Sequence, residues 1–436
     1  MQFSQLQRKE DGRTYTFTLL NSHVTYANTL RRLIMTGVET IAFRSDMTAT
    51  GTTTDVVVKR NDTPMTNEML ADRIGLIPIH IKDPLNWKAD QYQFTLSVFG
   101  DKDKNVYVRS KDFKVHDMSV LDETQENLDS SAENTLPTEQ FFPPNRLTGD
   151  TCLIAMLTPG AGAKQQAVEI VAKATKGTGR EHARFIPISQ CTYEYSPDND
   201  PARISEMFME WLHSAKMIST IDKASDRYAE LQREFNTMQI KRCFKVNERG
   251  EPFSFDFTVE SAGVLEVDYI VNRACEVGEN ICLRYVNLDK GDIPDDISIT
   301  TANSRIIGYD FLFRGHDHTL GNLLQTWMVE HLIEGGESPA VTYVGYSVPH
   351  PLRDEMVIRV GVEDGKEATA RLAIATAAKG CRELFKNLRI EWQKLIGGNT
   401  QGSVQATVAT PRRRPMNAVK KDVASTPVVS VRKLDE

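Results

Sequence analysis

A short pattern occurs twice in this chain, at a constant spacing of 294 residues (319 minus 25). The segment SHVTYANTLRRL at 22–33 aligns with HDHTLGNLLQTW at 316–327. Three identities fall at corresponding positions of the two copies: Thr25 and Thr319, Asn28 and Asn322, and Leu30 and Leu324. Such a repeat predicts two similar structural units in one chain.

The residues that follow each copy extend the repeat. Both copies continue in the order helix, strand, strand and long helix, judged from their apolar periodicity. The patterns cover 25–37, 39–45, 253–260 and 265–283 in the first copy, and 319–333, 341–348, 356–362 and 366–395 in the second. The first copy is interrupted at 47–189, which we interpret as an inserted domain.

The repeated helix carries a start signal. Thr25 and Thr319 have capping-box spacing with Asn28 and Asn322. A threonine hydroxyl at a helix start can accept a hydrogen bond from the backbone N–H three residues on, which stabilises the helix by about 1 kcal/mol. We therefore expect the two threonines to cap their helices, with an apolar stripe behind each cap.

Each unit of one sheet and two helices has little core of its own. The apolar helix faces would stay exposed to water unless the two units packed on each other. The sequence therefore predicts a pseudo-symmetric dimer within one chain. The side chains expected between the units are Leu33, Ile34, Val267, Ile270, Val271, Leu320, Leu323, Leu324, Trp327, Leu384, Phe385 and Leu388.

The overall pattern favours an α+β fold, because strand and helix patterns do not alternate regularly. Strands are expected at 14–20, 54–60, 91–100, 191–195, 253–260, 341–348 and 356–362. We predict two dimerisation units, each an antiparallel sheet with two helices, and a mostly β insert. The expected divisions are 1–46 with 190–285 for the first unit, 47–189 for the insert, 286–304 for a linker, 305–396 for the second unit and 397–436 for a disordered basic tail.

The charge of the chain argues against a body that clamps nucleic acid. The net charge is −7, whereas such proteins are normally basic. Residues 398–436 hold 7 Lys/Arg and 3 Asp/Glu, a local balance of +4 that leaves −11 for the rest. The runs Arg412-Arg413-Arg414 and Lys420-Lys421 suit nucleic-acid contact or targeting, and a merely solvating tail is the simpler interpretation. Residues 101–150, with 11 acidic and 6 basic residues, are expected to form a mobile acidic excursion.

The cysteines and the apolar runs indicate an intracellular protein with no membrane association. None of the six cysteines is spaced as C-x-x-C, so the sequence contains neither a zinc ribbon nor a thioredoxin-like pair. Scattered single cysteines favour reduced thiols. The N-terminus has no apolar signal-peptide core, and no apolar run approaches the ~18 residues of a membrane span.

Two motifs resemble catalytic or ligand sites at first sight. His316-Asp317-His318 would need a further metal ligand from elsewhere, so we interpret it as a polar helix entry. The run KGTGREH at 176–182 lacks the third glycine of G-x-G-x-x-G and the G-K-[ST] of a Walker loop. No Ser/His/Asp or Cys/His set has recognisable spacing. The residues therefore indicate no catalytic site and no cofactor.

Two charged pairs remain open to two interpretations. Arg31-Arg32 lies beside an apolar helix stripe. The two arginines either form a solvated helix face or belong to a surface that binds a partner by pairing with its carboxylates. Asp72-Arg73, in ADRIGLIPI at 71–79, is either structural or interfacial.

Several longer segments resemble a known family. NSHVTYANTLRRLIMTGVETIAF, NEMLADRIGLIPIH and GTGREHARFIPISQCTYEYSPD resemble the third-largest subunit of eukaryotic RNA polymerase II, its archaeal D-type equivalent and, more distantly, the N-terminal domain of the bacterial alpha subunit. DHTLGNLLQTWMVEHL and VTYVGYSVPHPLRDEMVIRV are similar to the small partner of that subunit, which is the archaeal L-type or the eukaryotic eleventh subunit. Together they cover most of 10–290 and 305–396. The resemblance implies a fusion of two subunits that are normally separate chains.

The resemblance also implies a function. The family's pair is a non-catalytic platform on which two large catalytic subunits of a DNA-dependent RNA polymerase dock. A small subunit like the eukaryotic tenth is a further expected partner, no separate L-type chain is needed, and DNA is reached only through the complex. By the family's motifs, the large-subunit interface comprises Asn28, Leu30, Arg31, Arg32, Asp72, Arg73, Gly75 and Leu76, while the partner-like half is marked by Thr319, Gly321, Asn322, Leu324 and His350-Pro351. The alternative is a nucleic-acid-binding accessory protein that acts through its basic tail.

The chain departs from the family in two respects. Many members hold zinc or an iron–sulfur cluster in the insert through clustered cysteines, whereas here the insert has only Cys152, with Cys191 at its edge, so no metal is expected. Gln325 stands where an arginine is often found. The fusion resembles the polymerases of large cytoplasmic DNA viruses, which would place the protein in the virion and host cytoplasm, with the nucleus as the alternative.

Overall fold

The computed structural model describes residues 1–9, 11–46, 55–120, 135–159, 165–302 and 305–402. Residues Met1–Ile396 form one compact unit. Among the described residues, no helix is both long and apolar enough to cross a membrane.

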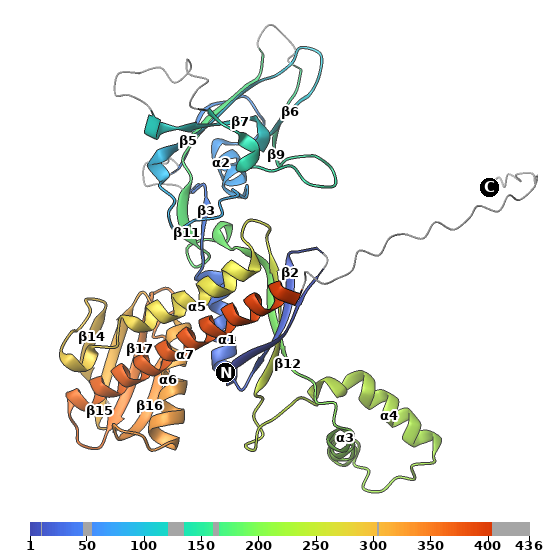
Figure 1. The fold of residues 1–436 in the computed structure, drawn as a ribbon, viewed down its shortest axis with the longest axis vertical. Helices are drawn as coiled ribbons and strands as arrows, with labels where there is room; N and C mark the ends of the chain where they lie inside the picture. Colours follow the sequence, from blue (N-terminus) through green and yellow to red (C-terminus); the bar gives the residue numbers. More distant parts are fainter. Residues whose placement is uncertain (10, 47–54, 121–134, 160–164, 303–304, 403–436) are drawn as a thin grey trace, which may run out of the picture. The chain divides into compact units, whose positions relative to one another are not determined.

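The first dimerisation unit is a four-stranded antiparallel sheet with two helices packed against it (Figure 1). The strand order is β1-β2-β13-β12, and alternate residues such as Phe17 of β2 and Phe257 of β13 are cross-strand partners in the core. This alternation is what buries one face of an antiparallel sheet. The elements are β1 (Gln2–Arg8), β2 (Thr14–Leu20), α1 (Val24–Thr36), β12 (Ile188–Tyr195), β13 (Ser254–Ser261) and α5 (Val267–Leu283).

The second unit has the same plan. Its strand order is β14-β15-β17-β16, with Phe311 of β15 opposite Ile358 of β17. The spacing of 294 residues extends to these strands, since Tyr15 and Phe17 of β2 correspond to Tyr309 and Phe311 of β15. The elements are β14 (Ile297–Thr301), β15 (Gly308–Arg314), α6 (His318–Met328), a π-helical turn (Val329–Glu334), β16 (Val341–Ser347), β17 (Glu355–Val362) and α7 (Glu367–Gly402). The predicted pair of similar α+β units is confirmed.

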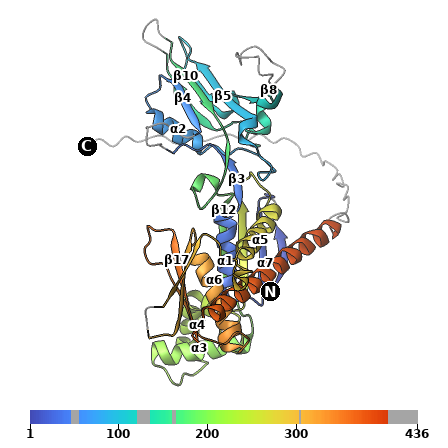
Figure 2. The same ribbon diagram turned by 90° about the vertical axis from the view of Figure 1, so that its left-hand side faces the viewer.

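The insert leaves the first unit after α1 and returns before β12. It has a separate apolar core, in which β4, β10 and β5 lie side by side and α2 packs against β4 (Figure 2). Ile41 and Phe43 belong to this core, so the inserted module begins earlier than the predicted residue 47. The elements are β3 (Glu39–Ala42), β4 (Val56–Asn61), α2 (Asn67–Gly75), β5 (Tyr92–Phe99), β6 (Val106–Arg109), β7 (Phe113–Asp117), β8 (Thr135–Leu136), β9 (Leu153–Leu157), β10 (Ala167–Ala172) and β11 (Thr175–Thr178).

A helical hairpin separates β12 from β13. It consists of α3 (Pro201–Lys216) and α4 (Asp226–Met238) and has a small apolar core of its own. Aromatic rings dominate that core, with Phe208 lying edge-to-face on Tyr228 and Phe235. The predicted helical period at 202–236 is thus two helices rather than one.

Each stretch predicted as a strand from its alternation overlaps a strand of the structure. The strand pattern at 39–45, however, is not the counterpart of 341–348 in the repeat. β3 pairs with β11 and not with the core sheet. The true counterpart of β16 is β12, because each is the edge strand beside the strand that precedes the long helix. The sequence order misleads here because the insert lies between α1 and its proper strand.

Three segments predicted to be irregular contain regular structure. The linker at 286–304 includes β14, and Leu288 and Ile297 are buried in the core of the two units. The excursion at 101–150 contains β6, β7 and β8, while 121–134 lies outside the described residues. The predicted tail begins inside α7, and its residues from 403 lie outside the described part. These strands were missed because two to five residues are too few to show a period.

Candidate functional site

The two repeated helices start at equivalent caps. His23 Nδ1 accepts a hydrogen bond from the Thr25 backbone N–H at 3.2 Å, and Asp317 Oδ1 accepts one from the Thr319 N–H at 2.8 Å. These caps are again 294 residues apart (317 minus 23). The prediction that Thr25 and Thr319 are the caps was wrong, because each threonine lies within the first turn of its helix. The interpretation of the HDH run as a helix entry is confirmed.

The hydroxyls of these threonines instead join α1 to α6. Thr25 Oγ1 lies 3.1 Å from Thr326 Oγ1, and Arg32 Nε donates to Thr319 Oγ1 at 2.7 Å. Under the 294-residue correspondence, Thr25 matches Thr319 and Arg32 matches Thr326. The two contacts are therefore the same contact seen from either side, which is the signature of an isologous interface.

Asp317 links its cap to this contact. Its Oδ2 lies 3.0 Å from the guanidinium of Arg32. Burial opposes ionisation of this carboxyl, yet hydrogen bonds from Thr319 and the charge of Arg32 together hold the pKa of Asp317 below its ordinary value. Both side chains are about one-third exposed, so the ion pair itself adds little, about 1 kcal/mol or less.

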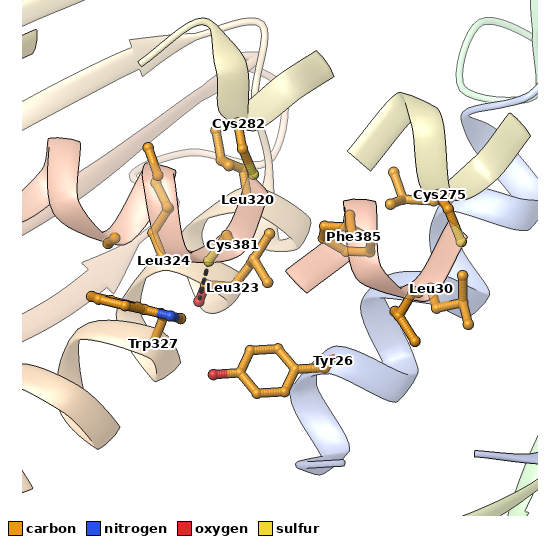
Figure 3. Close-up of a cluster of buried hydrophobic side chains, with 14 of the residues drawn as sticks. Tyr26, Leu30, Cys275, Cys282, Leu320, Leu323, Leu324, Trp327, Cys381 and Phe385 are labelled. Carbon is orange, nitrogen blue, oxygen red and sulfur yellow. Dashed lines mark hydrogen bonds between the residues drawn. The ribbon is translucent and has the colours of Figure 1, made fainter. Parts of the chain in front are cut away.

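An apolar core shared by both units lies behind these polar contacts. Figure 3 shows Tyr26 and Leu30 from α1, Leu323 and Trp327 from α6, and Phe385 from α7 in one cluster. Gly278 of α5 makes the approach possible, because a Cβ there would lie 2.8 Å from the Phe385 ring and 3.0 Å from Leu33. All the side chains predicted between the units lie in or against this cluster, with Leu384 only partly buried.

Ion pairs flank the same helices. Glu279 of α5, whose side chain is largely buried, lies 3.1 Å from Arg389 and 3.6 Å from Arg382 of α7. Trp392 donates its indole N–H to the Asp268 carbonyl of α5, and its ring meets Phe3 and Phe17 of the first sheet. The long helix of the second unit is therefore part of the first unit's core.

Other contacts between the units have no symmetric counterpart. Tyr26 donates to Glu330 Oε2 at 2.5 Å, and Arg180 donates to the Gly315 carbonyl at 2.7 Å and pairs with Asp354. Burial and the neighbouring carboxylate raise the pKa of Tyr26 above its ordinary value, so its hydroxyl remains a donor. These contacts make the two sides of the paired units different, although the contact between α1 and α6 is symmetric.

The run KGTGREH forms the joint between the insert and the first unit. A Cβ on Gly179 would collide with the Met35 carbonyl, and Glu181 pairs with Arg44 at 2.5 Å. His182 caps the short helix Ala183–Phe185 by accepting from the Arg184 N–H. Gly179, Glu181 and His182 thus already contact other residues of this chain, so the run is a structural joint.

Arg184 anchors α2 on this joint. Its side chain is 4% exposed and donates to the Phe43 carbonyl at 2.8 Å and to Ser45 Oγ at 2.6 Å. Ser45 Oγ in turn donates to Asp72 Oδ1 at 2.7 Å. Gly75 packs against Arg184, and a Cβ at 75 would lie 2.7 Å from its Nη1. The run from 71 to 79 is thus partly structural.

Comparison with known proteins extends this picture. A profile described as "RNA polymerase Rpb3/Rpb11 dimerisation domain" matches residues 16–282, and a second profile of the same description matches 309–391. The first match alone spans more than half of the chain. The chain belongs to the RNA polymerase Rpb3/Rpb11 dimerisation-domain family.

Individual relatives of this Rpb3/Rpb11-type chain are distant but extensive. It is 25% identical over 309 residues to "DNA-directed RNA polymerases I and III subunit RPAC1" of Bos taurus and of Homo sapiens, covering 64% of this chain and 82% of each relative. It is also 25% identical over 282 residues to "DNA-directed RNA polymerase subunit Rpo3" of Methanopyrus kandleri, covering 63% of this chain and 90% of that protein.

The interface residues implied for α1 differ in how deeply the structure buries them. Asn28 and Arg31 are half-buried, and the Arg31 guanidinium contacts Asn28 and Met35 of its own helix. Leu30 is fully buried in the shared core, and Arg32 joins α1 to α6. The predicted interface role of Leu30 was therefore wrong, because periodicity does not tell a core-facing position from an outward one when a second helix covers the face. The Arg32 side chain is 36% exposed, and its interface role stays a prediction.

A similar division holds on α2. Asp72, Arg73 and Leu76 are exposed, whereas Gly75 is buried beneath Arg184 and cannot reach a partner. Met69, missed from the sequence, is 59% exposed and shares the outer face with them at helical spacing. The sequence did contain the signal for Met69, because residues 69, 72, 73 and 76 have the i, i+3, i+4, i+7 spacing of one helix face. In the described part of the chain, no group of three or more His, Cys, Asp or Glu side chains could hold a metal.

Proposed function

We propose that this chain is a non-catalytic assembly platform of a multisubunit DNA-dependent RNA polymerase and docks the two large catalytic subunits. The observation that carries the proposal is a pair of dimerisation units joined by reciprocal contacts within one polypeptide. Joining two partners in one chain makes their association independent of concentration. A platform of this kind is complete without a separate small partner.

The fused arrangement accounts for both family matches in one chain. Relatives of the 16–282 part are named as RNA polymerase subunits. The proposal extends to further partners, which are a small subunit like the eukaryotic tenth and, through the complex only, DNA. A large DNA virus as source, with virion and host-cytoplasm localisation, is part of the same proposal.

Two surfaces suit the docking of large subunits. On α1, Asn28 and Arg31 are half-buried, and Arg31 donates to Asn28 Oδ1 within the helix. On α2, Met69, Asp72, Arg73 and Leu76 form one exposed face. Apolar side chains beside an arginine are typical of interface cores, where arginine is enriched and can pair with carboxylates.

Affinity purification from the native source tests the proposal. Two very large subunits should be recovered with the wild-type chain in equal amounts, and recovery of the chain alone would contradict the proposal. The double variant Arg31→Glu with Arg73→Glu should lower their recovery at least tenfold while the purified chain keeps its unfolding temperature.

Arg32→Glu is the matched control, since Arg32 lies between the units. It should lower the unfolding temperature, because its new charge faces Asp317. Deleting 398–436 should leave recovery of the large subunits unchanged. If that deletion abolished DNA binding by the lone chain instead, the tail-led accessory function would replace this one.

A further inference from the structure

The sheet of the second dimerisation unit ends on one side in a strand that no other described strand extends. β14 pairs with β15 alone and forms an outer edge of the four-stranded sheet (Figure 1). Its residues, ISITT, include no charged side chain and no proline. Such an edge is a template for a further strand, because its unpaired backbone groups can form the next row of hydrogen bonds.

The other three outer strands of the two dimerisation sheets are irregular. The pairing register shifts at 4–7 in β1, at 188–190 in β12 and at 341–343 in β16. Bulges of this kind twist an edge and hinder the pairing of a new strand. The pairing of β14 with β15, in contrast, runs without a shift from Ile297 to Thr301. Of these four described strands, β14 is therefore the one whose edge is regular.

The backbone groups of β14 face β15 and the open side in turn. The Asp296 carbonyl accepts a hydrogen bond from the end of β15 at 2.8 Å, and Ala302 N–H donates one to the start of β15 at 3.0 Å. Every second residue of an antiparallel strand bonds the same neighbour, so the even-numbered residues from 296 to 302 face β15. The N–H and C=O groups of Ile299 and Thr301 face the open side, where no described group bonds them.

The apolar core of the paired units reaches this edge. Ile297 is buried in that core, and Ile299 is half-buried against it. The two side chains lie on the same face because they are two residues apart in a strand. A strand placed beside β14 would cover Ile299 with its own side chains. The edge thus offers apolar contact as well as backbone hydrogen bonds, which together give affinity and specificity when a strand is added to a sheet.

The acidic residues before β14 indicate the charge of its partner. Asp296 pairs with Arg284 at 3.1 Å. Asp292 and Asp295 are exposed, and neither carboxylate forms an ion pair with a described residue. Opposite charges on neighbouring strands attract, so a basic side chain on the added strand suits this end of β14. Every pair of this sheet is antiparallel, and in that orientation the basic end of the added strand is its C-terminal end.

We propose that β14 binds an extended segment of a partner subunit, which adds a fifth strand to the four-stranded sheet of the second unit. The segment pairs antiparallel with β14, has uncharged β-branched residues at its centre and carries basic residues near its C-terminal end. The proposal rests on the proposed function, because the partner belongs to the assembly that the platform docks. The contact is separate from the α1 and α2 surfaces.

Hydrogen exchange of the full chain with a synthetic peptide tests the edge directly. The probe is acetyl-TVTVTKK-amide, and the control peptide is the same sequence with N-methylated central residues, which cannot donate. We expect the probe to slow exchange of the Ile299 and Thr301 amides by roughly tenfold or more, and the control to leave them unchanged. The Ser298 and Thr300 amides bond β15 and should be slow throughout. Lack of protection by the probe, or equal protection by both peptides, would overturn the proposal.

Variants of the edge test the same contact in the assembly. Ile299→Pro removes an outward N–H and no bond to β15, so the chain should keep its unfolding temperature. Recovery of a partner subunit on affinity purification should fall roughly tenfold or more. Thr301→Pro, at the exposed end of β14, replaces this variant if it does not fold. Thr300→Ala, on the opposite face of the sheet, is the control and should change nothing. Full recovery of every subunit with a folded proline variant would contradict the proposal.

The outcomes separate this proposal from the proposed function. If the large subunits copurify but the Ile299 and Thr301 amides exchange as fast in the complex as in the lone chain, the edge proposal fails and the platform stands. If the probe protects both amides but no large subunits copurify, the platform fails while the edge retains its specificity for a strand. Protection that rises with the concentration of the lone chain, together with dimers in sedimentation, would identify a second copy as the occupant and overturn the partner subunit.

Discussion

The two dimerisation units share one plan but differ in what their connections carry. In the second unit, α6 with its π-helical turn is followed closely by β16, and β16 is joined to β17 by residues 348–354. In the first unit, the corresponding connections hold the insert and the α3–α4 hairpin, each with its own apolar core. Longer connections cost little additional closure entropy, so a sheet tolerates them at its loops. Pairing of the two units therefore needs only the elements that they share.

The shared core should produce the largest effect when broken. Phe385→Ala removes a fully buried ring that touches the first unit at Gly278, and we expect a loss of about 3–5 kcal/mol in unfolding free energy. Chemical denaturation measures this loss. Leu372→Ala, at a 36% exposed position on the same helix, is the control and should change little. Equal losses would mean that the units do not depend on their common core.

A substitution in the insert should destabilise the insert without destabilising the two dimerisation units. Gly75→Ala places a methyl group 2.7 Å from Arg184 Nη1 and 3.0 Å from the Phe43 carbonyl. We expect about 1–3 kcal/mol of destabilisation from such overpacking, seen as faster hydrogen exchange in the insert and not in β2 or β15. Gly397→Ala, which meets nothing within 4 Å, is the control. Uniform acceleration across the chain would contradict the separation of the two cores.

The cap of α6 predicts a pH dependence in the second unit. Because the folded pKa of Asp317 is lowered, its carboxylate stabilises the protein above the ordinary Asp pKa of 3.8. This contribution is lost as the pH falls through the folded pKa. Asp317→Ala should cost about 1 kcal/mol at pH 7, and the difference from wild type should shrink below pH 4. A difference that stays constant through the acid range would exclude this origin.

The reciprocal hydrogen bonds should give the smallest effect and the sharpest test of symmetry. Double-mutant cycles that pair Thr25→Val with Thr326→Val, and Arg32→Met with Thr319→Val, should each give a coupling of about 0.5 kcal/mol. Similar values are expected because the two contacts correspond under the repeat. A coupling energy found in only one of the two cycles would show that the two contacts are not equivalent, although their residues correspond under the repeat.

Much of the fold was predictable because the relevant signals are local. Strands such as β2 and β17 alternate over seven or eight residues, and α5 and α7 keep a helical period over several turns. The caps were misassigned because His23 and Asp317 lie two residues before the threonines that showed the repeat. Leu30 was misplaced for a different reason, since its apolar position shows that it is buried but not which element covers it.

The presence of two related units follows from the amino-acid sequence alone, because the repeat at a constant spacing and the periodic apolar faces can be recognised without a structure. Three facts became visible only in the folded chain: Thr25 contacts Thr326, Arg184 anchors α2, and β12 rather than the nearer β3 completes the first sheet. These facts depend on contacts between residues far apart in the chain. Local periodicity carries no information about such distances, because packing chooses partners by shape and burial after the elements have formed.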